Sequence, residues 1–202
     1  MSVSPNSANK NSNLLYDLIS NWENETIEFK EASKDYDTDK IGRYVSALSN
    51  EANLSECGSA WLVFGVRNKT REVVGSDYRT DPERLNGLKF QIGSGTEPSM
   101  TFRSVKVLDE PAGRVIMFEI PAAPQGMPIA WKGQCFARAG ESLIPLSFDK
   151  QDAIRRQDHL LDWTAQVVND ATVSDLSSEA LKVARRAFTD RNASRIAPET
   201  ID

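Results

Sequence analysis

The sequence predicts an α+β fold, in which a mixed sheet carries flanking helices and a helical extension follows at the C-terminus. Two observations lead to this fold class. Helical and strand-like hydrophobic patterns alternate up to about residue 148, whereas residues 149–202 contain helical patterns alone. The 202 residues suffice for one domain with its own core and an appendage. We therefore expect a disordered leader at 1–12, a domain at 13–148 and a helical extension or linker at 149–202.

The first elements alternate between helix and strand. Leucine and isoleucine side chains with helical spacing predict a helix over 13–22. In the next segment, Ile27 and Phe29 alternate with polar side chains, which predicts a half-buried strand with a charged second face. A second amphipathic helix is expected over 38–51, opened by a capping aspartate or threonine.

The middle of the chain is rich in strands. The run 60–66 is almost continuously apolar, so we expect a central strand buried on both faces, joined in a hairpin to the short strand VVGS. The residues Thr-Asp-Pro-Glu at 80–83 predict the start of a helix that ends at Gly93 or Gly95. A hairpin is expected over 99–120. Two short strands are expected at 129–131 and 135–138, and a turn at 139–141 then leads to residues 143–145. Helices are expected at 153–160, at 161–168 and after a cap at Ser177 or Ser178.

Charge and composition narrow the classes of function. The net charge of −5 argues against a protein that coats nucleic acid through overall charge, although a local basic face stays open. No apolar run reaches the ~18 residues of a membrane helix, and the polar N-terminus is unlike a secretory signal. Cys57 and Cys135 are far apart, as expected for two reduced thiols. His159 is the only histidine, which excludes His-rich zinc sites. We therefore expect a cytoplasmic protein.

Glu23 and Glu28 form the first candidate site. Glu28 and Lys30 share one face of the expected strand, because strand side chains repeat every two residues, and Glu23 lies at the junction before that strand. Two converging carboxylates are suitable ligands for Mg²⁺ or Mn²⁺. Because runs of charge usually serve only solvation, the charge pattern alone favours an exposed, solvated strand face for these glutamates.

Cations from separate segments form a second candidate site. Three of them occupy the expected hairpin turn at 67–71, where side chains are exposed. If the whole set converges on one face it binds phosphates, and otherwise it is ordinary surface charge. Trp131 lies near basic residues and offers either a stacking surface for a base or an anchor in the core, of which the anchor is favoured. The complete set of cations is Lys30, Arg67, Lys69, Arg71, Lys132 and Arg138.

Several ordered motifs resemble the Schlafen AlbA_2 domain. They are ENETIEFKEA at the expected strand, a helix that ends in SALSN, the strand WLVFGV followed by VVG, and the closing FARAGES. Together they extend from about Glu23 to Ser147. The tail DWTAQVVNDATVSDLSSEALKVARRAF resembles the segment that follows this domain in large bacterial proteins described as transcriptional regulators or ATP-binding proteins. In that resemblance, residues 149–202 lead to a downstream ATPase module and winged helix that this chain does not contain.

The resemblance implies nucleic-acid binding. In the nuclease branch of the family, two glutamates at this spacing and an aspartate after the Gly-Val strand bind a divalent metal that cleaves RNA. Glu23 and Glu28 match the two glutamates, but the third position falls at Arg67 or Asn68, and neither supplies a carboxylate. Loss of an anionic ligand weakens Mg²⁺ binding, and a nearby arginine repels the metal. The resemblance therefore favours binding over cleavage.

Three hypotheses stay open. The leading one is a DNA- or RNA-binding module of a bacterial transcriptional regulator, without a cofactor, in which phosphates are contacted by Lys30, Arg67, Lys69 and Arg138. The second is a metal-dependent endoribonuclease, in which the two glutamates hold Mg²⁺ or Mn²⁺. The third is an assembly module without nucleic acid, in which the sheet and the C-terminal helices form a homodimer or dock further domains.

Overall fold

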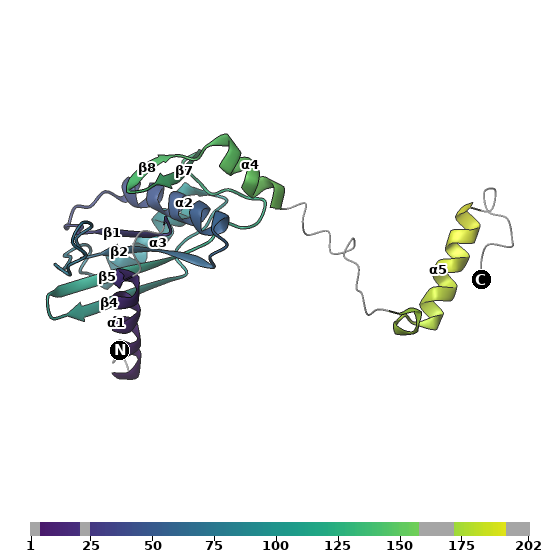
Figure 1. Cartoon of the computed structure of the whole chain (residues 1–202), viewed down its shortest axis with the longest axis horizontal. Coiled ribbons are helices and arrows are strands. Elements are labelled where there is room, and N and C mark those ends of the chain that lie inside the picture. The colour runs from purple at the N-terminus through teal and green to yellow at the C-terminus, as the bar shows by residue number, and fades with distance from the viewer. Residues whose placement is uncertain (1–4, 21–24, 158–171, 193–202) are drawn as a thin grey trace. The chain divides into compact units, whose positions relative to one another are not determined.

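The computed structural model describes residues 5–20, 25–157 and 172–192, and its helices and strands confirm the α+β fold (Figure 1). The chain divides into two units, Met1–Leu161 and Asp162–Asp202, and each is described by itself. All strands of the described residues belong to the first unit. None of the described helices is long and apolar enough to cross a membrane.

The main sheet of the first unit is mixed, as predicted. Its strand order is β1 (Ile27–Lys30), β2 (Ser59–Phe64), β5 (Gly113–Pro121) and β4 (Ser104–Glu110). β1 runs parallel to β2, with Phe29 opposite Val63, and the other neighbours are antiparallel. Along β2, Leu62 and Phe64 belong to one buried cluster and Val63 to another. Burial on both faces confirms that the apolar run 60–66 contains a central strand.

Helices cover both faces of this sheet (Figure 1). They are α1 (Pro5–Ser20), α2 (Thr38–Leu54) and α3 (Pro82–Gly95). α1 packs Leu15 and Leu18 into the cluster on one face, while α2 and α3 pack their apolar side chains into the cluster on the other. Asp37 caps α2 and Asp81 caps α3, each accepting a hydrogen bond from the N–H two residues ahead, at 2.9 and 2.8 Å respectively. The two caps confirm the predicted starts of these helices.

A second, smaller sheet lies on the other side of α2 (Figure 1). Its strand order is β3 (Thr96–Glu97), β6 (Ala130–Trp131), β7 (Gln134–Ala139) and β8 (Ser142–Pro145). α2 packs against β2 and β5 of the main sheet and against β6, β7 and β8 of the smaller one. This helix is therefore the layer that both sheets share.

Two members of a buried polar stripe on α2, Ser46 and Asn50, hold the segment 129–136 in place. The stripe consists of Ser46, Ser49, Asn50 and Asn53. Asn50 donates from Nδ2 to the carbonyl oxygens of Ile129 and Phe136, at 2.9 and 3.0 Å, and its Oδ1 accepts from the Ile129 N–H at 2.8 Å. Ser46 accepts from the Phe136 N–H at 3.0 Å. Buried backbone N–H and C=O groups have to be paired. On the side of segment 129–136 that faces α2, these side chains supply the hydrogen bonds that a neighbouring strand would otherwise supply.

The first unit continues into α4 (Phe148–Arg156), which begins earlier than the predicted 153. Ser147 caps this helix, and Ile154 is fully buried. Lys150 Nζ binds the Glu51 carboxylate of α2 at 2.6 Å. These contacts attach α4 to the first unit, whose boundary at residue 161 therefore lies beyond the expected 148.

The second unit contains, among its described residues, the short 3-10 helix η3 (Val173–Asp175) and α5 (Ser178–Asn192). The Ser177 hydroxyl accepts a hydrogen bond from the Ala180 N–H at 3.4 Å, so a helix capped by this serine is confirmed. The helix predicted over 161–168 lies outside the described residues.

Two local predictions are wrong. Residues 5–12, expected in a disordered leader, are helical, because α1 begins at Pro5, a residue that favours the first turn of a helix. The segment VVGS is not a strand and contributes only the isolated bridge between Val66 and Val73. The cause is Gly65, whose φ of +94° turns the chain and whose carbonyl accepts hydrogen bonds from two consecutive N–H groups of that segment.

Candidate nucleic-acid interface

Glu28 is buried rather than solvated. On β1 it alternates with Phe29, and the residue is only 1% exposed. Its Oε1 lies 2.5 Å from Lys30 Nζ and its Oε2 lies 2.5 Å from Arg138 Nη1. The expectation of a solvated strand face is therefore wrong for this glutamate, which is the buried counter-ion of two cations.

Arg138 reaches Glu28 from β7 and is 6% exposed. Its Nη1 also donates to the Ile27 carbonyl at 2.6 Å, and its Nη2 donates to the Gly140 carbonyl at 2.9 Å. The guanidinium thus ties the edge strand β1 to the turn between β7 and β8. The segments ENETIEFKEA and FARAGES, at opposite ends of the domain sequence, meet at this one side chain.

Lys30 completes the buried ionic group. Its Nζ lies 5.3 Å from the centroid of the Tyr44 ring. Burial by itself lowers the pKa of Lys30, but the hydrogen bond and the negative charge of Glu28 outweigh burial and raise the pKa above its usual value. Lys30 is therefore protonated at neutral pH, and two positive side chains share one carboxylate.

The described residues do not fit a divalent metal ion at Glu28. Both carboxylate oxygens face a cation at 2.5 Å, and these cations repel a metal. The third ligand position of the nuclease pattern holds Arg67 or Asn68. Within the ranges that the structure describes, no three Asp, Glu, His or Cys side chains gather as a metal site requires. Glu23 lies outside those ranges.

Three of the predicted cations follow β2 in residues 67–71, which we call the basic loop. Arg67 has a 44% exposed side chain and binds Glu31 at 3.3 Å and Glu72 at 2.7 Å. Lys69 is exposed and makes no ion pair with any residue in the described part of the chain. The loop therefore presents two cations to solvent, one of them already balanced by exposed carboxylates.

A pocket of about 250 Å³ connects the basic loop to the buried ionic group. Arg71, at a φ of +61°, places its guanidinium 4.4 Å from the centroid of the Phe29 ring and lines this pocket together with Arg138. The full lining is Glu25, Ile27, Asn68, Arg71, Arg138, Gly140 and Glu141. Two guanidinium groups, one amide and two carboxylates thus meet in one concave site.

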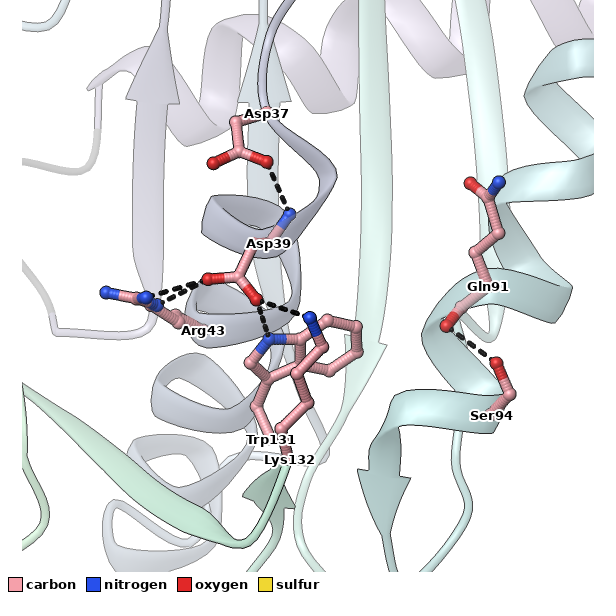
Figure 2. A network of polar contacts seen from close by, with 7 residues as sticks. All are labelled: Asp37, Asp39, Arg43, Gln91, Ser94, Trp131 and Lys132. Carbon is pink, nitrogen blue, oxygen red and sulfur yellow. Dashed lines mark hydrogen bonds and ion pairs between the residues drawn. The ribbon is translucent and has the colours of Figure 1, made fainter.

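Lys132, the remaining predicted cation, belongs to a separate network at the N-terminus of α2 (Figure 2). Asp39 accepts hydrogen bonds from Trp131 Nε1 at 2.8 Å, from Lys132 Nζ at 2.9 Å and from Arg43 Nε at 2.8 Å. These contacts, with the Trp131 hydrogen bond as the largest cause, lower the pKa of Asp39 to about 2. The six predicted cations therefore do not form a single patch.

Trp131 is an anchor in the core, as favoured from the sequence. The residue is 4% exposed, and its ring lies between α2 and α3. A Cβ added at Gly42 would lie 2.2 Å from the ring, and one added at Gly95 would lie 2.3 Å from it. The indole is therefore enclosed on both sides and does not offer a stacking surface to a base.

Sequence reasoning missed Glu51 and Lys150. Glu51 is 1% exposed, and its carboxylate binds Lys150 Nζ at 2.6 and 2.9 Å and accepts from the Arg138 N–H at 3.2 Å. The signal that could have located this contact is the polar stripe on either side of Glu51, because polar side chains repeating at helical spacing inside an apolar helix indicate a buried polar contact.

Comparisons with known proteins identify one family. The family model described as Schlafen, AlbA_2 matches residues 23–147. No curated protein matches the sequence. The crystal structure of the DIP2311 protein from Corynebacterium diphtheriae is 19% identical with a TM-score of 0.52, and the match covers 95% of this chain and 36% of that one. This chain thus spans little more than a third of that relative, and the likeness shows the fold alone.

A second similar structure is the N-terminal domain of a RecG-related protein from Nitrosomonas europaea. It is 20% identical with a TM-score of 0.45, and the match covers 67% of this chain and 88% of that domain.

Proposed function

Because the chain belongs to the Schlafen AlbA_2 family, we propose that it is a nucleic-acid-binding module whose basic loop contacts the phosphate backbone. The observation that carries the proposal is the placement of Arg67, Lys69 and Arg71 within five consecutive residues, beside a pocket that Arg138 also lines. The finer role, as the DNA-binding part of a cytoplasmic bacterial transcriptional regulator, is part of the same proposal and rests on the resemblance.

The electrostatics of the loop support phosphate contacts. Within the described ranges Lys69 has no carboxylate partner that a phosphate would have to displace, and the ion pairs of Arg67 with Glu31 and Glu72 are exposed. Exposed ion pairs contribute only about 0–1 kcal/mol, so a phosphate can replace these carboxylates at little cost. With a net charge of −5, attraction has to come from this local group rather than from the molecule as a whole.

Lys30 and Arg138, for which the sequence also predicts phosphate contacts, have a different part in the proposal. Their charged groups are held by Glu28 at 2.5 Å, and Arg138 is 6% exposed. Direct phosphate contact by these two residues stays a prediction. Their proposed contribution is to fix β1 and the pocket wall beneath the basic loop and to add positive potential there.

The test is retention of labelled single-stranded RNA, tRNA and duplex DNA by the full chain at low salt, on native gels. We expect a salt-sensitive shift that the double variant Arg67→Glu, Lys69→Glu weakens at least tenfold, with the salt dependence reduced by about two ions. The charge-reversal control is Arg84→Glu, compared with each single variant of the loop; Arg84 is an exposed residue of α3 outside the pocket lining, and its reversal should leave retention unchanged.

Two outcomes would contradict this proposal. Absence of any shift at low salt, or a shift that the double variant leaves intact, would remove the basic loop from the function and favour an assembly module. Parallel denaturing gels with and without Mn²⁺ test cleavage. Products that require Mn²⁺ and vanish in Glu23→Ala, with the fold of that variant verified by circular dichroism, would instead establish the nuclease hypothesis.

A further inference from the structure

The pocket beside the basic loop combines opposite charges that do not neutralise one another. Its charged lining residues are Arg71, Arg138, Glu25 and Glu141. Within the ranges that the structure describes, neither arginine forms an ion pair with either of these glutamates. The contact of Glu25 with Lys150 is long, at 3.8 Å. The pocket therefore offers both donors and acceptors to a ligand.

Arg71 supplies the donors of this pocket. Its guanidinium lies 4.4 Å from the centroid of the buried Phe29 ring, and its hydrogen bond from Nη1 to Asn68 Oδ1 is long, at 3.5 Å. Because a guanidinium has five N–H donors in a planar fork, Arg71 has further donors for a pair of acceptors in the pocket. Arg138 contributes charge instead, since its Nη1 and Nη2 atoms already donate to backbone carbonyls.

The two carboxylates of the pocket argue against a phosphate as its occupant. Carboxylate oxygens accept hydrogen bonds and repel a negative group. A suitable occupant instead has N–H donors for Glu25 and Glu141 and acceptors for Arg71. The volume of about 250 Å³ lies below the ~300–1,000 Å³ of sites for drug-sized ligands, so the occupant is small.

Among the four bases of a nucleic acid, guanine meets both requirements. Its N1–H and N2 amino groups are adjacent donors, which a carboxylate can accept together. Its O6 and N7 atoms are adjacent acceptors, to which an arginine fork binds. Each of the other three bases has a hydrogen-bond donor at only one ring position. Unpaired bases expose these edges to a protein.

We propose that this pocket binds an unpaired guanine of a strand whose phosphates contact the basic loop. Arg71 donates to O6 and N7 of the base, and the carboxylates of Glu25 and Glu141 accept from its N1–H and N2 amino groups. The inference rests on the proposed function, because the loop brings the strand to the pocket. It adds a base preference to phosphate contacts that by themselves carry none.

Fluorescence anisotropy of the full chain at low salt tests the proposal, with labelled uridine strands of about 12 nucleotides. One strand contains uridine alone, and the others have a single central guanine, adenine, cytosine or inosine. Matching thymidine-based DNA strands are measured in parallel. We expect the guanine strand to bind at least tenfold more tightly than the all-uridine strand. Inosine, which lacks the N2 amino group, should lose most of this preference.

Two variants separate base recognition from phosphate binding. Arg71→Lys keeps the charge and removes the planar fork, so it should reduce the preference for guanine at least fivefold and leave the all-uridine strand unaffected. The double variant Glu25→Gln, Glu141→Gln should abolish the preference, while loss of two negative charges leaves the all-uridine strand bound at least as tightly as before. The matched control, Glu83→Gln, changes an exposed residue of α3 outside the pocket lining and should keep the preference.

The possible outcomes distinguish this inference from the proposed function. Salt-sensitive binding with equal affinity for every strand would overturn the inference alone, and so would a guanine preference that the double variant keeps. If no strand binds, the proposed function is wrong, and calorimetric titration with 5′-GMP decides about the pocket. Binding of 5′-GMP that the double variant loses would support a guanine site, and absence of binding would overturn it.

Discussion

Among single residues, Glu28 binds side chains that come from both ends of the domain sequence. Lys30 is its neighbour on β1, whereas Arg138 lies on β7, more than a hundred residues later. With the carboxylate present, each cation has a partner at 2.5 Å. Without it, Arg138 would keep an uncompensated charge at a 6% exposed side chain beside the 24% exposed Lys30, and such buried unpaired charges are costly.

We therefore expect Glu28→Gln to lower the free energy of unfolding by about 3 kcal/mol, because the amide keeps the shape and removes the charge. Urea unfolding followed by circular dichroism measures this difference. Glu31→Gln is the control, since Glu31 has a 61% exposed side chain and should change stability by no more than about 0.5 kcal/mol. Equal effects of the two variants would show that Glu28 is not electrostatically buried.

Asp39 gives a prediction about pH. Its hydrogen bonds to Trp131 and Lys132 lower its pKa to about 2 in the folded state, below the ~3.9 of an unperturbed aspartate. The stabilisation is therefore fully present above about pH 4 and is lost as the pH falls toward 2. The stability difference between the wild type and Asp39→Asn should shrink over this window, as measured by urea unfolding at several pH values. A difference that stays constant with pH would contradict the assignment.

For single residues, the sequence predicts the surroundings of Trp131 but not those of Glu28. The core position of Trp131 follows from its residue type and context, and the structure confirms it. The burial of Glu28 does not follow from the sequence. The alternation of polar and apolar residues in a strand does not show that an arginine of another strand packs against the carboxylate. From the sequence, a charged side chain on a strand is therefore expected to face solvent, as most such residues do.

Among the elements, α2 decides how the two sheets fit together. Its N-terminal turn packs against Trp131 of the smaller sheet, and its polar stripe holds the segment 129–136. Gly42 and Gly95 are the positions at which α2 and α3 approach the indole, with no room for a Cβ on either side. Close packing of this kind is sensitive to a single methyl group.

Gly42→Ala should accordingly destabilise the first unit by about 1–3 kcal/mol, although alanine favours helices, because its Cβ would lie 2.2 Å from the Trp131 ring. Gly87→Ala in α3 is the matched control: its Cβ would meet nothing within 4 Å, so the higher helix propensity should raise stability by up to about 1 kcal/mol. Thermal unfolding measures the change in stability of each variant relative to the wild type. If both substitutions raised the stability, or both lowered it, the packing described for Gly42 would be contradicted.

Elements with strong local signals were predictable. α3 has a capping aspartate, a proline in its first turn and three apolar residues at helical spacing, and the structure confirms it. The hairpin of β4 and β5 likewise follows from its turn residues. VVGS has strand-forming residues, but Gly65 and Gly75 both have positive φ and bend the chain before a ladder can form. Local propensity does not reveal whether a strand finds a partner.

For the whole molecule, the position of α2 between the two sheets has a consequence for the order of events during synthesis. Asn50 leaves the ribosome long before its hydrogen-bond partners Ile129 and Phe136, which follow 79 and 86 residues later. At roughly 5–20 residues per second, the helix waits on the order of ten seconds with its polar stripe hydrated and its apolar side uncovered. The nascent domain thus passes through a stage in which the central layer is present while β4 and β5 of the main sheet and all of the smaller sheet are still to be made.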